Sequence, residues 1–426
     1  MKARAPAGAE RRQMNTARRP ELLLLCGLHA PGTEAVIARI RTLDPDVAVL
    51  HHDLRDIGSG RVHRRLRHGD RDERTVLELA HGCLSCTLRE DLLPQLRLLS
   101  EGGGPRRIVL HLDPTLEPEQ VCWSLLHVLV DSAPITDRLD LRGVITCIDA
   151  GSWLDDATGD LTLGERGLAE LSDDERTMAQ VAVGQAEFAD VLVHTGTADA
   201  WQLARTDAVL ERLAPAATRT FVSGLDTRAL VADLPPAARR GRPDDVHGPL
   251  LRGEPPLFRD CGVQLSVFCA RRPFHPERLH DAIDALLDGV VRTRGRIWLA
   301  TRPEAVLWLE SAGGGLRIGQ AGEWLAAGNA DAWAAADPER RALASLGWHP
   351  RFGDRSQDVV VLSHDADPAG IQAALAGALL TDAELAAGEA AWRTFPDPFG
   401  WWHTDPCEPP AGLAAAGSTD AEHEEH

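Results

Sequence analysis

The chain has 426 residues, a formal net charge of −19, 44% hydrophobic residues and 26% charged residues. These values are typical of a globular protein with about two or three cores. The acidic balance argues against a surface devoted to nucleic-acid phosphates. No apolar run approaches the ~20 residues that span a bilayer, and residues 1–20 lack the apolar centre of a secretory signal. We therefore expect a cytoplasmic protein without a membrane partner.

Basic residues gather in two places against this acidic background. The leader, residues 1–20, carries six of them against Glu10 alone, and a second cluster runs from Arg61 to Arg74. We predict a disordered, solvated leader rather than an RNA-binding arm, and little direct nucleic-acid binding. Lys2 is the only lysine of the chain. Any mechanism that needs a lysine inside the fold is therefore excluded.

Residues 21–234 alternate between apolar, strand-like runs and amphipathic stretches. This alternation predicts an α/β domain, a mostly parallel sheet with helices on both faces. The expected helices are Thr33–Leu43, Pro118–Val130 and Arg176–Phe188. The expected strands are Leu22–Leu28, Val47–His52, Val76–Ala80, Ile108–Leu112, Val144–Ile148, Val191–His194 and Thr220–Val222.

A stretch rich in Pro, Gly and charge, residues 235–256, predicts a linker. The pattern after it is that of a smaller α+β domain over residues 257–410, and residues 411–426 predict a disordered tail. Its expected strands and helices are Val263–Ala270, Val291–Ala300, Val306–Glu310, Val359–Ser363, Pro276–Leu287 and Pro368–Leu379.

The first expected strand runs into a sequence with the glycine spacing of a P-loop. Gly27 and Gly32 keep that spacing, but Thr33 stands where the phosphate-binding lysine belongs and Glu34 where the Mg²⁺-binding hydroxyl belongs. A cation is lost and an anion gained, and at an effective dielectric near 20 a charge pair about 4 Å apart is worth roughly 4 kcal/mol. The predicted nucleotide site, Gly27–Glu34, is therefore a degenerate one.

Two other segments lack residues that a GTPase uses. At the end of the strand expected at 108–112, His111 and Pro114 replace the usual acidic residue and glycine, and proline has no amide to offer a phosphate. Where an Asn-Lys-x-Asp sequence would read guanine, residues 195–198 are Thr-Gly-Thr-Ala. We interpret GTP hydrolysis as absent and GTP binding as disfavoured, so an enzymatic role is not expected.

Cys83 and Cys86 form a C-x-x-C pair that leads from a strand into a helix. Such a pair binds Zn²⁺, cycles between thiols and a disulfide, or has no functional role, and all three alternatives stay open. A tetrahedral metal needs two further ligands, for which Glu78 and His81 are the nearest candidates. A second His/Cys group near the end, His403, Asp405 and Cys407, is more typical of a solvated tail.

The motif E-x-x-x-G-C-x-x-C-T-x-R-x-D-L at Glu78–Leu92 resembles the CobW-like branch of P-loop GTPases, where three cysteines read C-x-C-C. Ser85 stands at the middle cysteine here. The stretches RPFHPERL from Arg272, RTRGRIWLA from Arg292 and GDRSQ from Gly353 resemble a CobW C-terminal domain. The resemblance implies a GTP-dependent zinc or cobalt metallochaperone.

Several stretches, among them LELAHGCLSCTLREDLLP and PDPFGWWHTDPCE, are similar to an actinobacterial CobW-like branch, the ribosome hibernation factor-recruiting proteins called Mrf. This resemblance implies a pseudo-GTPase that acts under zinc limitation. Its expected partners are a hibernation-promoting factor and the small ribosomal subunit. We weigh this function first, the metallochaperone second and a thiol redox protein third.

Overall fold

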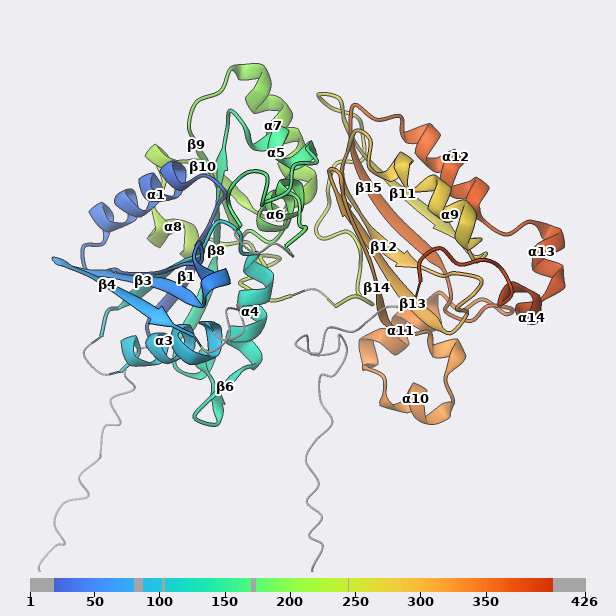
Figure 1. Ribbon diagram of the computed structural model, residues 1–426, viewed down its shortest axis with the longest axis horizontal. Coiled ribbons are helices and arrows are strands. Elements are labelled where there is room, and N and C mark those ends of the chain that lie inside the picture. Colours follow the sequence, from blue (N-terminus) through green and yellow to red (C-terminus); the bar gives the residue numbers. More distant parts are fainter. Residues whose placement is uncertain (1–18, 80–86, 102–103, 170–173, 244, 401–426) are drawn as a thin grey trace, which may run out of the picture.

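The computed structural model describes residues 19–79, 87–101, 104–169, 174–243 and 245–400. Two large sheets organise this part of the chain (Figure 1). The first has eight strands in the order β10-β9-β8-β1-β5-β2-β3-β4, and the second has five in the order β11-β15-β12-β13-β14. The predicted fold class, a mostly parallel α/β sheet followed by a smaller α+β domain, is confirmed.

The eight-stranded sheet is parallel except at one edge. β5 pairs in parallel with β1 and β2, and β1 pairs in parallel with β8, whereas β3 pairs antiparallel with both β2 and β4. The basic cluster from Arg61 to Arg74 thus forms a hairpin, and the strand expected at Val76–Ala80 instead covers Arg71–Glu78. The strands are β1 (Glu21–Cys26), β2 (Ala48–Asp53), β3 (Arg61–His68), β4 (Arg71–Glu78), β5 (Arg107–His111), β8 (Asp140–Asp149), β9 (Val191–Thr195) and β10 (Thr218–Phe221).

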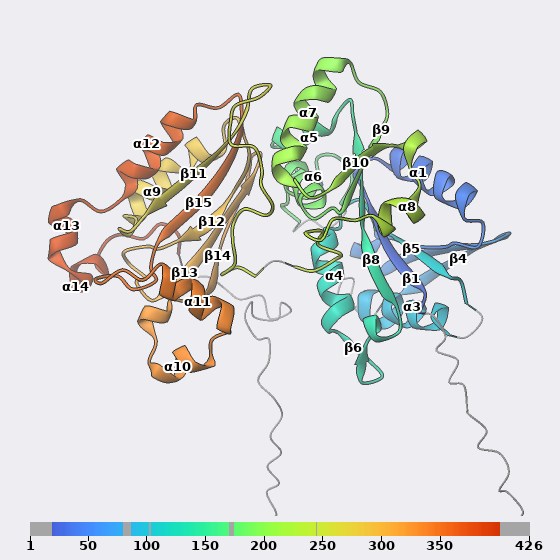
Figure 2. The same cartoon turned by 180° about the vertical axis from the view of Figure 1, so that it is seen from behind.

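Helices cover both faces of this sheet (Figures 1 and 2). Alternate side chains of a strand point to opposite faces. Leu23 and Leu25 of β1 accordingly pack with α1, and Leu22 and Leu24 pack with α3 and α4. The helical elements are α1 (Ala30–Leu43), the π-helical turn η2 (Leu88–Leu92), α3 (Leu93–Leu99), α4 (Pro118–His127), α5 (Trp153–Thr158), α6 (Met178–Glu187), α7 (Ala200–Leu213) and α8 (Thr227–Ala232).

The five-stranded sheet is antiparallel, and α9 and α12 cover its outer face (Figure 1). Its strands are β11 (Val263–Ala270), β12 (Val290–Ile297), β13 (Ala305–Ala312), β14 (Gly315–Glu323) and β15 (Gln357–His364). Its helices are α9 (Pro276–Ala282), α10 (Ala330–Ala335), α11 (Pro338–Leu346), α12 (Pro368–Ala378), α13 (Asp382–Ala387) and α14 (Glu389–Trp392). Within the described ranges, no helix is long and apolar enough to cross a bilayer.

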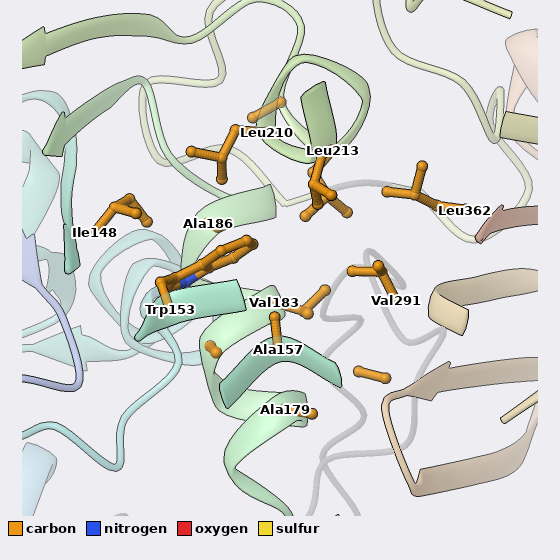
Figure 3. Close-up of a cluster of buried hydrophobic side chains, with 14 of the residues drawn as sticks. Ile148, Trp153, Ala157, Ala179, Val183, Ala186, Leu210, Leu213, Val291 and Leu362 are labelled. Carbon is orange, nitrogen blue, oxygen red and sulfur yellow. The ribbon is translucent and has the colours of Figure 1, made fainter. Parts of the chain in front are cut away.

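The inner face of the five-stranded sheet packs against the first domain. Figure 3 shows Val183 of α6 and Leu213 of α7 in one buried cluster with Val291 and Leu362 of the second sheet. Both faces of β15 are therefore buried, which explains its continuous run of apolar residues. The segment 235–256, expected as a linker, packs on β12, because Arg296 donates a hydrogen bond of 2.7 Å to the Gly248 carbonyl.

Candidate functional site

The connection between β1 and α1, where a P-loop would lie, is only Gly27, Leu28 and His29. The helix begins at Ala30, not at Thr33 as expected, with a proline in its first turn. Proline fits there because its fixed φ suits a helix and its missing amide is not needed. The amides of Gly32 and Thr33 both donate to the His29 carbonyl, at 3.0 and 3.2 Å. Two amides of the expected phosphate loop are therefore used inside the helix.

The two glycines of this segment are explained by close packing. A Cβ atom on Gly27 would lie 2.8 Å from the Cβ of Cys147, and one on Gly32 would lie 2.5 Å from the Oγ1 of Thr195. Neither distance is tolerated unless the neighbouring residue shifts. The spacing that resembles a P-loop thus also lets α1 approach β8 and β9.

Thr33 and Glu34 point away from a common ligand position. Thr33 is buried, and its hydroxyl donates to the Ala30 carbonyl at 3.0 Å. Glu34 forms a bidentate ion pair with Arg67 of β3, with N–O distances of 2.9 and 3.2 Å. Arg67 therefore neutralises the negative charge that Glu34 places beside the expected phosphate position.

Polar side chains that the sequence analysis missed occupy the carboxyl edge of β8. The Nε2 atom of His29 lies 2.8 Å from the Oδ2 atom of Asp156 and 3.1 Å from the Oγ atom of Ser152. Ser152 also donates to Asp149, at 3.0 Å. The hydrogen bond to Asp156 raises the pKa of His29. The sequence did carry a signal for these residues, because polar residues directly after a parallel strand lie at the edge of the sheet where ligands bind.

His111 ends β5 and Pro114 lies in the loop that follows, and hydrogen bonds hold this segment on both sides. His111 is buried and stacks on His51 with ring centroids 4.3 Å apart, and burial lowers the pKa of His111 to about 3. The Pro114 carbonyl accepts a hydrogen bond of 3.0 Å from Gln185 of α6. Asp113 accepts the backbone amide of Leu54 at 2.9 Å. This loop therefore connects β2, β5 and α6.

Three of the four candidate metal ligands, His81, Cys83 and Cys86, lie outside the described residues. The fourth, Glu78, ends β4 and is exposed. Where the chain resumes, a buried hydrogen bond of 2.7 Å joins His52 of β2 to Asp91 of η2. Among the described side chains, no group of three or more His, Cys, Asp or Glu residues is arranged to hold a metal ion.

Two family models match the chain. Residues 35–220 match the CobW/HypB/UreG nucleotide-binding domain, and residues 263–379 match the cobalamin synthesis protein CobW C-terminal domain. The chain is also 50% identical over 339 residues to the zinc chaperone Rv0106 of Mycobacterium tuberculosis, covering 78% of this chain and 81% of that protein. The chain belongs to the CobW family.

A more distant relative is the zinc-regulated GTPase metalloprotein activator 1 of Dictyostelium discoideum. It is 26% identical over 363 residues, which cover 78% of this chain and 72% of that protein. A crystal structure of Zn(II)-bound YjiA GTPase from E. coli is 15% identical with a TM-score of 0.35, and the match covers 85% of this chain and 99% of YjiA. That similarity is too low to add to the argument.

Proposed function

We propose that this CobW protein is a zinc chaperone, which binds Zn²⁺ as cargo and passes it to a recipient protein. The observation that carries the proposal is the 50% identity, over 81% of its length, to a protein named as a zinc chaperone. The ligand chemistry of the chain is in keeping with zinc. Cys83 and Cys86 offer two thiolates, and thiolate, imidazole and carboxylate groups are the usual ligands of Zn²⁺.

We further propose that nucleotide binding at the carboxyl edge does not follow the family's P-loop chemistry. Support comes from the buried Thr33 at the lysine position and from the Gly32 and Thr33 amides, which bond within α1. The absence of any lysine beyond Lys2 supports it too, because no ammonium group of the fold can reach a γ-phosphate. A fluorescent GTP analogue should show no saturable binding at physiological Mg²⁺. Micromolar affinity would overturn this part of the proposal.

Recruitment of a hibernation-promoting factor to the small ribosomal subunit stays a prediction from motif resemblance. The two relatives described above are named for zinc and not for ribosomes, so we place zinc delivery first. Affinity capture of the full chain from zinc-depleted and zinc-replete cells separates the two functions. Capture of ribosomal proteins with a hibernation factor only under depletion would favour the recruiter, and capture of a zinc-dependent enzyme would favour the chaperone.

Zinc binding itself is tested by competition with a chromophoric chelator. We expect the full chain to hold one Zn²⁺, and the variant Cys83→Ser/Cys86→Ser to lose about 100-fold or more in affinity because both thiolates are gone. The matched control is Cys261→Ser/Cys269→Ser, which removes two partly or fully exposed thiols elsewhere. Equal affinity in all three proteins would place the metal elsewhere. A reversible Cys83–Cys86 disulfide without zinc binding would favour the redox alternative.

A further inference from the structure

A groove opens on the first domain beside α4 and a short hairpin. The hairpin joins β6 (Leu129–Val130) to β7 (Ala133–Pro134) and extends from the end of α4 (Figures 1 and 2). The groove has a volume of about 420 Å³, which lies within the range of roughly 300–1,000 Å³ that ligand sites occupy. Its described lining includes Arg89 of η2, Leu93 of α3, Trp123 and His127 of α4, and Leu129 and Val130 of the hairpin.

The apolar part of this groove is open to solvent. Trp123 and Leu129 are 39% and 63% exposed. Large apolar side chains that gather in one exposed hollow mark an interaction surface, whereas single ones scattered over a surface do not. Tryptophan is also among the residues that contribute most to binding energy at protein interfaces.

Contacts within the first domain hold the walls of the groove in place. The rings of Trp123 and His127 stack with centroids 4.9 Å apart, and Nδ1 of His127 donates to the Trp123 carbonyl at 2.9 Å. The hairpin turn has positive φ at Asp131 and Ser132, 51° and 72°, as a two-residue turn of type I′ requires. An ion pair between Asp131 and Arg97 ties this turn to α3. Walls that are already ordered lower the entropic cost of binding.

Arg89 gives the groove a positive charge that no described carboxylate neutralises. It is exposed, and it is the only Arg, Lys, Asp or Glu among the described lining residues. Asp91, two residues along the chain, pairs with Arg64 instead, and the exposed Glu90 is not part of the described lining. On a chain with a net charge of −19 this cation is a local exception, and it favours a partner that brings a carboxylate.

The groove also lies close to the proposed zinc ligands along the chain. Arg89 follows Cys86 by three residues, and three residues span at most about 11 Å. A partner held in the groove would therefore have its own metal ligands near the two thiolates. Such proximity speeds a transfer between two sites, because the second encounter becomes intramolecular.

We propose that this groove docks a segment of the protein that receives the zinc. The segment places a large apolar side chain on Trp123 and Leu129 and a neighbouring carboxylate on Arg89. A guanidinium group matches a carboxylate with two parallel hydrogen bonds, so the pair adds direction to the apolar contact. This inference rests on the proposed zinc delivery, which it extends by naming where the recipient binds and by what chemistry.

The first test is selection from a random peptide library on the immobilised full chain, followed by fluorescence anisotropy with labelled copies of the enriched peptides. We expect these peptides to share a large apolar residue close to Asp or Glu. Trp123→Ser and Arg89→Gln should each weaken their binding about tenfold or more. The matched controls are Trp201→Ser, at an indole 60% exposed on α7, and Arg74→Gln on the exposed strand β4. Both controls should bind like the unchanged protein.

The second test follows zinc itself. An enriched peptide is joined to a zinc-free Cys₂His₂ finger, which folds only when it binds zinc. Transfer from the zinc-loaded full chain, monitored by circular dichroism, should be about tenfold faster or more to this fusion than to the bare finger. Trp123→Ser should remove the difference, whereas Trp201→Ser should keep it.

The outcomes separate this inference from the proposed function. Failure of the unchanged chain to bind zinc in the chelator assay would overturn zinc delivery. If zinc binds, the docking groove is overturned by a selection without enriched peptides, by enriched peptides without a carboxylate, or by equal transfer rates to the fusion and the bare finger. Equal peptide affinity in Trp123→Ser and Trp201→Ser would overturn it as well. Self-association that light scattering detects and that only Trp123→Ser abolishes would assign the groove to a second copy of the chain instead.

Discussion

Replacement of Gly32 by alanine tests why a glycine stands in the first turn of α1. The added Cβ would meet three atoms of one side chain, at 2.5 Å from the Oγ1 of Thr195, 3.1 Å from its Cβ and 3.3 Å from its Cγ2. Rotation about χ1 would move Oγ1 away from the new Cβ, but it would break the hydrogen bond from Thr195 to the Ile148 carbonyl and would leave the Cβ of Thr195 at 3.1 Å. Thr195 is buried at the end of β9, so it has little room to withdraw.

Two opposing terms set the size of the effect. Alanine gains about 1 kcal/mol over glycine in a helix, whereas overpacking a buried contact costs about 1–3 kcal/mol. With three contacts this short, we expect Gly32→Ala to lower the free energy of unfolding by about 1–2 kcal/mol. The control is Gly377→Ala in α12, where the new Cβ meets nothing within 4 Å. That variant should gain about 0.5–1 kcal/mol.

Urea denaturation followed by far-ultraviolet circular dichroism measures both variants. The midpoint should fall for Gly32→Ala and rise for Gly377→Ala. Thr195→Ala removes the two outer atoms of the clash, so Gly32→Ala should cost about 1 kcal/mol less in that background. If Gly32 served only to let the backbone approach a ligand, the added Cβ would meet no clash and Gly32→Ala would stabilise the protein. If Gly32→Ala stabilises the protein as Gly377→Ala does, the packing explanation is refuted.

Two further predictions concern buried charge. The pKa of His111 is about 3 in the folded protein, below the value near 6.5 in the unfolded chain. As the pH falls between those two values, only the unfolded chain takes up this proton. The free energy of unfolding should therefore drop by about 1.4 kcal/mol per pH unit over that range. His111→Phe should flatten that slope in urea titrations from pH 7 to 4, and an unchanged slope would contradict the assignment. Glu187→Gln should cost about 3–5 kcal/mol because Arg292 and Arg294 lose their shared partner. The control Glu304→Gln, which breaks an exposed ion pair with Arg393, should cost no more than about 1 kcal/mol. Equal melting temperatures for Glu187→Gln and Glu304→Gln would count against a buried interdomain network.

Strands with apolar runs were predicted well, and the misses have physical causes. β11 was predicted with its observed bounds, Val263–Ala270. β14 was missed because it contains three glycines, which weaken a strand, and its pairing with β13 supplies the order. β3 was read only as a cluster of arginines. It lies next to the edge of the sheet, where polar residues replace the apolar pattern of a central strand.

The candidate site was likewise predicted only in part from the sequence. Spacing alone located the positions Gly27, Gly32, Thr33 and Glu34. It did not predict that the two glycines serve close packing or that Glu34 forms an ion pair. Asp149, Ser152 and Asp156, which join His29 in a hydrogen-bonded group, carried only the weak signal of their place after a strand. Their partner is more than one hundred residues away in the chain, so no local pattern could pair them.

The sequence by itself determined the CobW resemblance and the lack of any lysine beyond Lys2, because both depend on which residues are present. Only the tertiary structure decided that Arg67 neutralises Glu34 and that Glu187 pairs with two arginines of the second domain. The physical reason is that charge interactions depend on distance and burial. Those quantities arise only when α1 meets β3 and when α6 meets β12.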